Sequence, residues 1–176
     1  MATITQRQAG RARLIILDTN IWLDYYLGFR AGNAAATRLL TFANNSSCEL
    51  LYAVTSSKDL FYLIAADFKR AARQNSGGVL SEGDSAAANE VAWACLSHMG
   101  QIATAVACDE SDVWVARKQR PLHADYEDDL VVAAAVRVKA DLLVTNDELL
   151  LRHSPVATLS CADAITYLGG DLPACR

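Results

Sequence analysis

The chain has 176 residues, of which 52% are hydrophobic and 20% are charged, and it carries a formal net charge of −4. This length and composition predict a globular protein with one substantial core, and no apolar run approaches the roughly 20 residues that a membrane span needs. The acidic balance argues against avid nonspecific binding to nucleic acid, although local basic patches are compatible with it.

Residues 1–13 form a polar segment without the apolar stretch of a signal peptide, and we interpret this segment as a leader. We therefore expect residues 14–176 to form a single domain. The five cysteines include no C-x-x-C pair and no Cys/His cluster, which argues against a zinc site and favours free thiols in a reducing cytoplasm. We expect a cytoplasmic protein that does not associate with a membrane.

Short apolar runs alternate along the chain with stretches of helical periodicity. The runs predict strands over residues 14–17, 49–54, 102–108, 141–145 and 156–159. Helices are predicted over residues 20–29, 34–44, 60–73, 85–99, 148–153 and 160–168, with two more after Asp109 and after Asp125; residues 74–84 and 117–124 are predicted loops. This alternation predicts the α/β class, as a three-layer α/β/α sandwich with a central parallel sheet of four to five strands.

The first strand ends at Asp18, and Thr19 and Asn20 follow as residue types that favour helix starts. The unbroken aliphatic run before Asp18 is typical of a parallel strand that is buried on both faces. Ligands of open α/β sheets bind outside the carboxyl ends of the strands, so Asp18 lies where a site is expected. The alternative is that Asp18 only caps the helix that follows.

Three more carboxylates lie at junctions: Asp59 and Asp128 are expected to open helices, and Asp147 follows a strand. If the first strand lies between the second and the fourth, all four acids meet at one edge of the sheet. Each also has a structural explanation, because Asp59 could form a capping box with Ser56, Asp128 could do so with Asp125, and Asp147 could favour the positive end of its helix.

Clustered carboxylates repel one another, and a hard divalent cation such as Mg²⁺ relieves that repulsion. A bound cation of this kind lowers the pKa of its water and neutralises charge on a phosphodiester. The sequence contains no Ser/His/Asp or Cys/His signature and no glycine-rich phosphate loop that would compete for the role. The residues therefore support the hypothesis of an acidic, metal-binding site.

Four segments resemble the motifs of the PIN domain family. Residues 14–21 (LIILDTNI) resemble its opening motif, 57–62 (SKDLFY) the second motif of a subgroup, 126–130 (YEDDL) the third motif and 143–147 (LVTND) the fourth. The resemblance implies a metal-dependent ribonuclease fold with a parallel sheet and an acidic pocket for Mg²⁺ or Mn²⁺. It also implies a likeness to the toxins of VapC-type toxin–antitoxin pairs, which are usually homodimers inhibited by a cognate antitoxin.

The resemblance also implies site residues by position. The catalytic and metal-binding residues would be Asp18, Asp59, Asp128 and Asp147, with Thr19, Asn20, Asp125 and Asn146 as supporting residues. Two positions depart from the family pattern, because Asp59 stands where Glu is more common and Asn146 stands where Arg usually precedes the last acid. Asp125 or Asp129 could also take the place of Asp128.

A basic segment lies between the two helices that follow Asp109 and Asp125. Its possible RNA contacts are Arg117, Lys118, Arg120 and His123. Trp114 or Tyr126 could stack on a base. The alternative is a solvated loop with two aromatic residues in the core, and for Trp114 we favour the core.

Three functional hypotheses stay open. The first is an Mg²⁺- or Mn²⁺-dependent endoribonuclease acting on RNA, as the toxin of a type II toxin–antitoxin pair. The second is a catalytically weak interaction or RNA-binding module on the PIN fold, which the departures at Asp59 and Asn146 favour slightly. The third is a receiver domain or a haloacid-dehalogenase-type phosphatase. It fits poorly, because that phosphatase needs D-x-D where this chain has Asp18-Thr19-Asn20.

Overall fold

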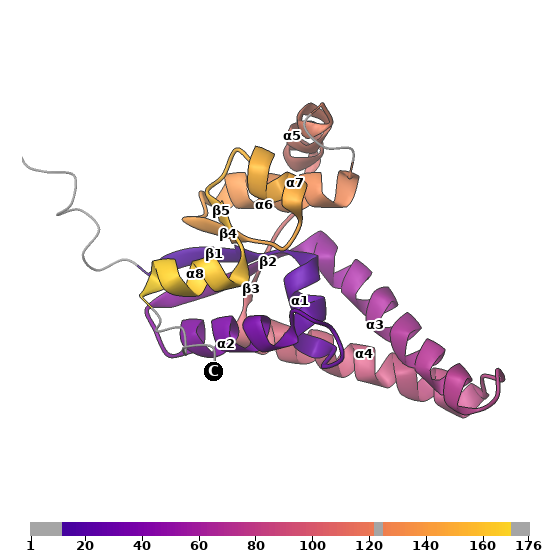
Figure 1. Ribbon diagram of the computed structural model, residues 1–176. Helices are drawn as coiled ribbons and strands as arrows, with labels where there is room; N and C mark the ends of the chain where they lie inside the picture. Colours follow the sequence, from indigo (N-terminus) through magenta and orange to yellow (C-terminus); the bar gives the residue numbers. More distant parts are fainter. Residues whose placement is uncertain (1–11, 122–124, 170–176) are drawn as a thin grey trace, which may run out of the picture.

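A five-stranded sheet with helices on both faces forms the fold, in a computed structural model that describes residues 12–121 and 125–169 (Figure 1). The strands are β1 (Arg13–Leu17), β2 (Cys48–Ala53), β3 (Thr104–Val106), β4 (Leu142–Val144) and β5 (Thr158–Leu159). The helices of these residues are α1 (Thr19–Tyr26), α2 (Asn33–Asn44), α3 (Val54–Asn75), α4 (Glu82–Ile102), α5 (Glu110–Gln119), α6 (Tyr126–Val138), α7 (Glu148–His153) and α8 (Cys161–Leu168). Within the same two ranges, no helix has both the length and the apolar character of a membrane span.

The strands all run parallel in the order β3-β2-β1-β4-β5, so β1 lies at the centre of the sheet. Ile15 of β1 pairs with Leu50 of β2 on one side and with Leu142 of β4 on the other. The predicted α/β class and parallel sheet are confirmed, and so is the neighbour order that we assumed. The carboxyl ends of β1, β2 and β4 therefore meet at one edge, where α1, α3 and α7 begin.

Side chains of β1 alternate between the two faces of the sheet, as the strand period of two requires. Ile15 and Leu17 belong to an apolar cluster with residues of α1, α2, α3, α4 and α8, whereas Ile16 belongs to a second cluster with residues of α6 and α7. Each face has its own apolar cluster, and Trp22 of α1 is fully buried in the first. Because both faces are covered, β1 is an unbroken aliphatic run rather than an alternating one.

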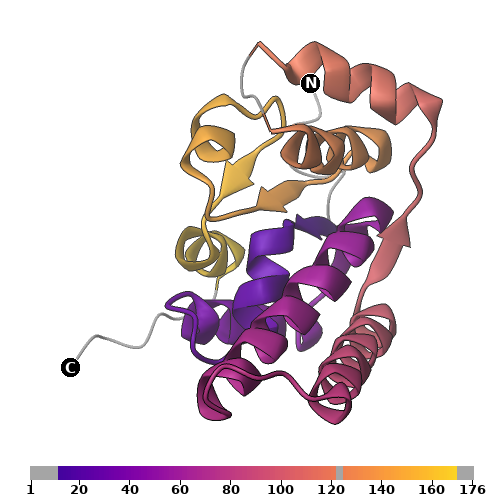
Figure 2. The same cartoon turned by 90° about the vertical axis from the view of Figure 1, so that its right-hand side faces the viewer.

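Helices α3 and α4 are longer than predicted and run side by side as an antiparallel arm (Figure 2). The loop predicted over residues 74–84 shrinks to 76–81. The capping box predicted for Ser56 and Asp59 is wrong, because α3 begins at Val54 and its N-cap, Ala53, makes no side-chain cap bond. Packing of α3 against α4 and α1 offsets the weak helix propensity of the Val-Thr-Ser-Ser stretch.

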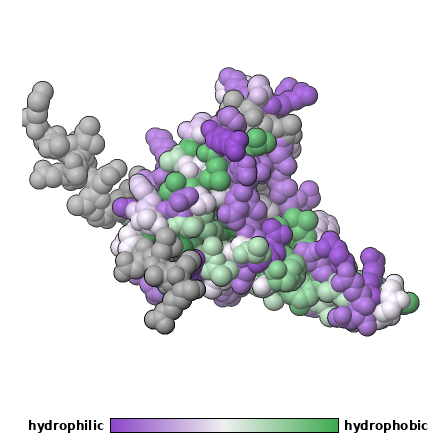
Figure 3. Space-filling view, in the orientation of Figure 1, coloured by the Kyte–Doolittle hydropathy of each residue, from purple (hydrophilic) through white to green (hydrophobic). Residues whose placement is uncertain are grey.

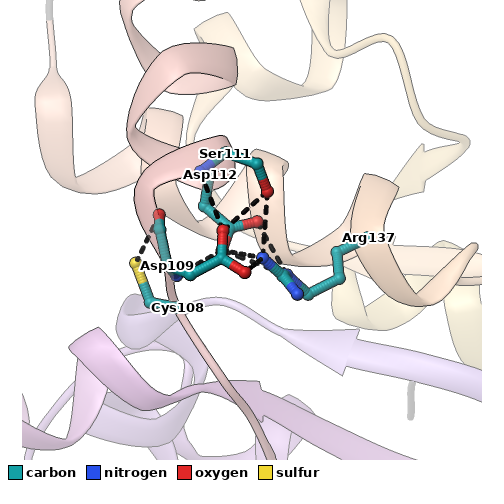
Figure 4. Close-up of polar contacts among 5 residues, drawn as sticks. All are labelled: Cys108, Asp109, Ser111, Asp112 and Arg137. Atoms are coloured by element: carbon teal, nitrogen blue, oxygen red, sulfur yellow. Dashed lines mark hydrogen bonds and ion pairs between the residues drawn. The ribbon is translucent and has the colours of Figure 1, made fainter.

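Helix α5 packs on α6 and is tied to it by an ion pair (Figure 4). Arg137 of α6 places its Nη2 atom 2.6 Å from Oδ2 of Asp112 and 2.5 Å from Oδ2 of Asp109. Asp109 is the N-cap of α5 and forms a capping box with Asp112. The hydrogen bonds from Arg137 hold the pKa of Asp112 below its usual range. The start of α5 is therefore fixed to α6 by charge.

Candidate functional site

Asp18 lies at the carboxyl end of β1, and its carboxylate is 1% exposed. Its Oδ1 atom accepts a hydrogen bond from the Thr19 N–H at 2.6 Å. Its Oδ2 atom accepts from the Thr145 hydroxyl and the Asn20 amide, each at 2.6 Å. Burial still raises the pKa of Asp18 to about 6, and the charge of Asp147 adds to the rise. Asp18 is thus the N-cap of α1 and a buried acid at the expected edge at the same time.

The corner between β4 and α7 is hydrogen-bonded to the start of α1. Thr145 is fully buried, and its hydroxyl accepts from the Asn20 amide and from the Asp147 N–H, each at 3.0 Å. The Asn146 N–H donates to Oδ1 of Asn20 at 3.1 Å. Oδ1 of Asp147 accepts from two N–H groups at the start of α7 and so caps that helix. The first and fourth motifs therefore form one hydrogen-bonded unit.

Asp128 lies in the first turn of α6, half-buried, near the other acids. Burial raises its pKa to about 7, and the negative charges of Asp18, Asp125 and Asp147 add to the rise. The cap of α6 is Asp125, whose Oδ1 accepts from the Glu127 N–H at 2.9 Å. The capping role thus belongs to Asp125, and the Asp128 carboxylate is left in the electrostatic field of Asp18 and Asp147.

Asp59 lies in the second turn of α3, next to Glu127 of α6. After burial, the charge of Asp59 is the main cause of the raised pKa of Glu127. Our sequence analysis did not single out Glu127, although it immediately precedes Asp128. Adjacent residues on a helix point about 100° apart, so spacing alone assigns only one of the two to a site. Glu127 lies beside Asp59 because α3 approaches α6, and only the tertiary structure shows this approach.

The basic residues expected to contact RNA lie at the end of α5. The predicted start of the loop at residue 117 is wrong, because α5 continues through Arg117 and Lys118 to Gln119. Arg117, Lys118 and Arg120 are exposed. His123 lies outside the described residues. The helix thus presents three cations a few residues before α6 begins.

Trp114 is 58% exposed, so our expectation of a core position was wrong. Lys118 lies one turn further along α5, and its Nζ atom is 3.5 Å from the centroid of the Trp114 ring. Tyr126, at the start of α6, is 52% exposed. Both aromatic rings are therefore accessible, in the middle of α5 and at the start of α6.

The sequence profile of the PIN domain matches residues 14–149. The chain belongs to the PIN domain family. No curated protein sequence matches it.

Solved structures of similar fold agree with this membership. One is VapBC2 from Rickettsia felis bound to a DNA fragment from its promoter, at a TM-score of 0.59 and 14% identity over 84% of this chain and 98% of that chain. Another is FitAcB from Neisseria gonorrhoeae, at a TM-score of 0.57 and 15% identity over 84% of this chain and 98% of that chain. A third is VapC20 from Mycobacterium tuberculosis, a sarcin-ricin loop cleaving toxin, at a TM-score of 0.52 and 10% identity over 73% of this chain and 86% of that chain. The likeness is one of fold and confirms the three-layer architecture.

The carboxylates of Asp18, Asp128 and Asp147 are of the chemical type that binds a hard cation, because carboxylate oxygens are the ligands that Mg²⁺ and Mn²⁺ prefer. Within residues 12–121 and 125–169, however, no three His, Cys, Asp or Glu side chains form a group that could hold a metal ion. Protein donors engage both oxygens of Asp18, and Oδ1 of Asp147 faces α7. The raised pKa values of Asp18 and Asp128 reflect burial and repulsion, which a cation would relieve.

Proposed function

We propose that this PIN domain is an Mg²⁺- or Mn²⁺-dependent endoribonuclease that hydrolyses RNA phosphodiester bonds. The observation that supports it best is the pair of carboxylates Asp18, which is buried, and Asp128, which is half-buried. Burial raises their pKa values to about 6 and about 7, and neighbouring carboxylates add to the rise: Asp147 and Asp125 for Asp18, and Asp18 and Asp125 for Asp128. Such an arrangement costs stability unless a cation or a proton neutralises it. Membership of the PIN domain family supports the same proposal.

The proposed ligands are Asp18, Asp128 and Asp147, with Asp59 approaching from α3. When bound, the ion would lower the pKa of a coordinated water and neutralise charge on the phosphodiester. Hydrogen bonds from Thr145 and Asn20 fix the position of Oδ2 of Asp18.

The proposed RNA contacts are Arg117, Lys118 and Arg120 at the end of α5, with Trp114 of the same helix as a stacking surface and with His123, which lies outside the described residues. Cations bind phosphates, and aromatic faces stack on unpaired bases. Because Arg137 fixes α5 to α6, the cationic side chains at the end of α5 are held near the helix start that carries Asp128. Single-stranded or looped RNA is therefore the substrate class that we propose.

We infer further that the protein is the toxin of a type II toxin–antitoxin pair, inhibited by a cognate antitoxin, and that it forms a homodimer. Large apolar side chains are exposed on the arm formed by α3 and α4, including Tyr62, Leu63 and Trp93. Figure 3 shows apolar surface along this arm where it leaves the sheet. Exposed apolar surface of this kind favours a protein partner.

The test is cleavage of labelled RNAs, including a sarcin-ricin loop stem because VapC20 cleaves that loop. Each RNA is incubated with Mn²⁺, with Mg²⁺ or with excess chelator. The wild-type protein is compared with Asp18→Asn and with Asp84→Asn, a control at an exposed capping acid on the far end of the arm. We expect metal-dependent cutting by the wild type and by Asp84→Asn, and its loss in Asp18→Asn. Cutting that survives in Asp18→Asn would contradict the assignment.

A catalytically weak RNA-binding module is the second candidate, and two observations favour it. No three metal-binding side chains converge within the described residues, and Asp18, Asp125 and Asp147 all act as helix caps. The same RNAs discriminate the two functions. Tight RNA binding with neither cutting nor Mn²⁺ binding by calorimetry would support the module, whereas Mn²⁺ binding without cutting would indicate a different substrate.

A further inference from the structure

Asp24 of α1 is a buried carboxylate outside the four motifs, with an exposed fraction of 5%. Its Oδ1 atom accepts a charged hydrogen bond from Nε of Arg30 at 2.6 Å. Its Oδ2 atom accepts a second hydrogen bond from the Asn146 amide at 2.8 Å, across 122 residues of sequence. Both oxygens thus have partners, so Asp24 is held as an acceptor rather than left available as a ligand.

The loop between α1 and α2 folds tightly around this carboxylate. A Cβ atom at Gly32 would lie 1.9 Å from Oδ2 of Asp24. Gly32 has φ −78° and ψ −9°, which any residue can adopt, so space rather than backbone freedom requires glycine here. Asn33 completes the arrangement by donating its amide to the carbonyl groups of Asp24 and Tyr25. The position of the Asp24 carboxylate is therefore set by its own loop.

Asn146 connects this buried carboxylate to the acidic site. Its side chain donates to Asp24, while its backbone N–H donates to Asn20. The next residue is Asp147, whose N–H is bonded to Thr145. The corner that carries Asp147 is thus held from two sides, by Asn20 of the first motif and by Asp24 one helical turn further along α1.

We propose that Asp24 is a positioning residue of the acidic site, acting through Asn146 to hold the corner that carries Asp147. The inference rests on the proposed function, because Asp147 matters as a ligand only in a metal-binding site. Groups that orient metal ligands by hydrogen bonds commonly change metal affinity or activity by about 10- to 100-fold when they are removed. Asn146, which stands where PIN domains usually have Arg, is then a functional connection and not a defect of the motif.

The test compares Asn146→Ala and Gly32→Ala with the wild-type full chain. Asn45→Ala is the matched control, because the Asn45 amide bonds only within α2. Mn²⁺ binding is measured by calorimetry, and amide hydrogen exchange of residues 144–150 is measured without metal. We expect both test variants to bind Mn²⁺ about tenfold more weakly and to exchange faster over residues 144–150. Asn45→Ala should match the wild type in both measurements.

A side-chain exchange separates positioning from general loss of stability. Asn146→Asp places two carboxylates against each other and should weaken Mn²⁺ binding. The double variant Asp24→Asn with Asn146→Asp restores one donor and one acceptor at unchanged net charge, and it should recover most of the affinity. Tighter Mn²⁺ binding by Asn146→Asp alone would make residue 146 a ligand and would overturn the positioning role.

The two proposals fail in different ways. Unchanged hydrogen exchange over residues 144–150 in Asn146→Ala and Gly32→Ala would overturn the role of Asp24, whatever the wild type binds. Faster exchange in both variants, together with a wild type that binds no Mn²⁺, would support the role of Asp24 in positioning the corner that carries Asp147 and would overturn the proposed metal-dependent function. Faster exchange with unchanged Mn²⁺ affinity would overturn the inference as well.

Discussion

Thr145 is the side chain on which the hydrogen bonds of the acidic corner converge. It donates to Asp18 and accepts from Asn20 and from the Asp147 N–H, while being fully buried. A hydroxyl with these three partners links two strands and two helix starts. Its loss leaves a buried carboxylate oxygen short of a donor, which is more costly than the loss of the bond itself.

Thr145→Val keeps the shape of the side chain and replaces the hydroxyl with a methyl group. We expect a loss of about 1–3 kcal/mol in the free energy of unfolding, measured by urea denaturation in chelator. The pKa of Asp18 should also rise further, because the Thr145 hydrogen bond lowers it now. Thr41→Val is the control, since the Thr41 hydroxyl is exposed and bonds only within α2. Equal losses in the two variants would refute the role of Thr145.

Among the elements, α5 packs on α6 and is also tied to it by the ion pairs of Arg137. Arg137 binds Asp112 through Nε and Nη2 and also reaches Asp109 and Ser111. All three partners lie at the start of α5, while the proposed RNA contacts lie at its other end. The ion pair therefore orients a helix whose function is expected to lie a few turns away.

Arg137→Met should detach α5 from α6 without removing the apolar part of the side chain. We expect faster amide hydrogen exchange over residues 110–119 and a lower midpoint of thermal unfolding. Arg152→Met is the matched control, because its ion pair with Glu148 is exposed on both sides and lies within α7. Such a surface pair contributes about 0.5 kcal/mol or less. If the amides of α5 exchange no faster in Arg137→Met than in the wild type, the role of this ion pair in holding α5 is contradicted.

For the whole molecule, the acidic edge couples folding to protons and to metal. The pKa values of Asp18 and Asp128 rise to about 6 and about 7 in the folded protein, from the ordinary carboxyl value of 3.8. The fold therefore disfavours their charged forms, and the metal-free protein loses stability as the pH rises from about 4 to about 7. The lowered pKa of Asp112 acts below this range and does not oppose the trend.

We predict that, in chelator, the midpoint of thermal unfolding is higher at pH 5 than at pH 8. Mn²⁺ should stabilise the protein more at pH 8, because protons compete for the same oxygens at pH 5. At a concentration 100 times its dissociation constant, Mn²⁺ adds about 2.7 kcal/mol, or roughly 5–10 °C. Asp18→Asn should flatten the pH dependence and abolish the shift with Mn²⁺. A wild-type midpoint in chelator that increases from pH 5 to pH 8 would contradict this account.

The sequence by itself determined the features that depend on neighbours a few residues apart. The unbroken run before Asp18 predicted a central buried strand, and the alternation of strands and helices predicted the parallel sheet. The junction positions of Asp18 and Asp147 predicted that each follows a strand, whereas the meeting of these acids with Asp59 and Asp128 at one edge depended on an assumed strand order. Each of these features depends on strand period, on burial of both faces or on helix starts, and all of these act locally along the chain.

Only the tertiary structure decided the features that depend on contacts between distant elements. The approach of α3 to α6 brings Glu127 beside Asp59, and the crossing of α5 over α6 leaves Trp114 exposed. The hydrogen bond from Asn146 to Asp24 spans 122 residues, and no sequence pattern near either residue predicts it. Such pairings are set by how whole faces pack, because a local pattern shows that a side chain is buried but not which partner it meets.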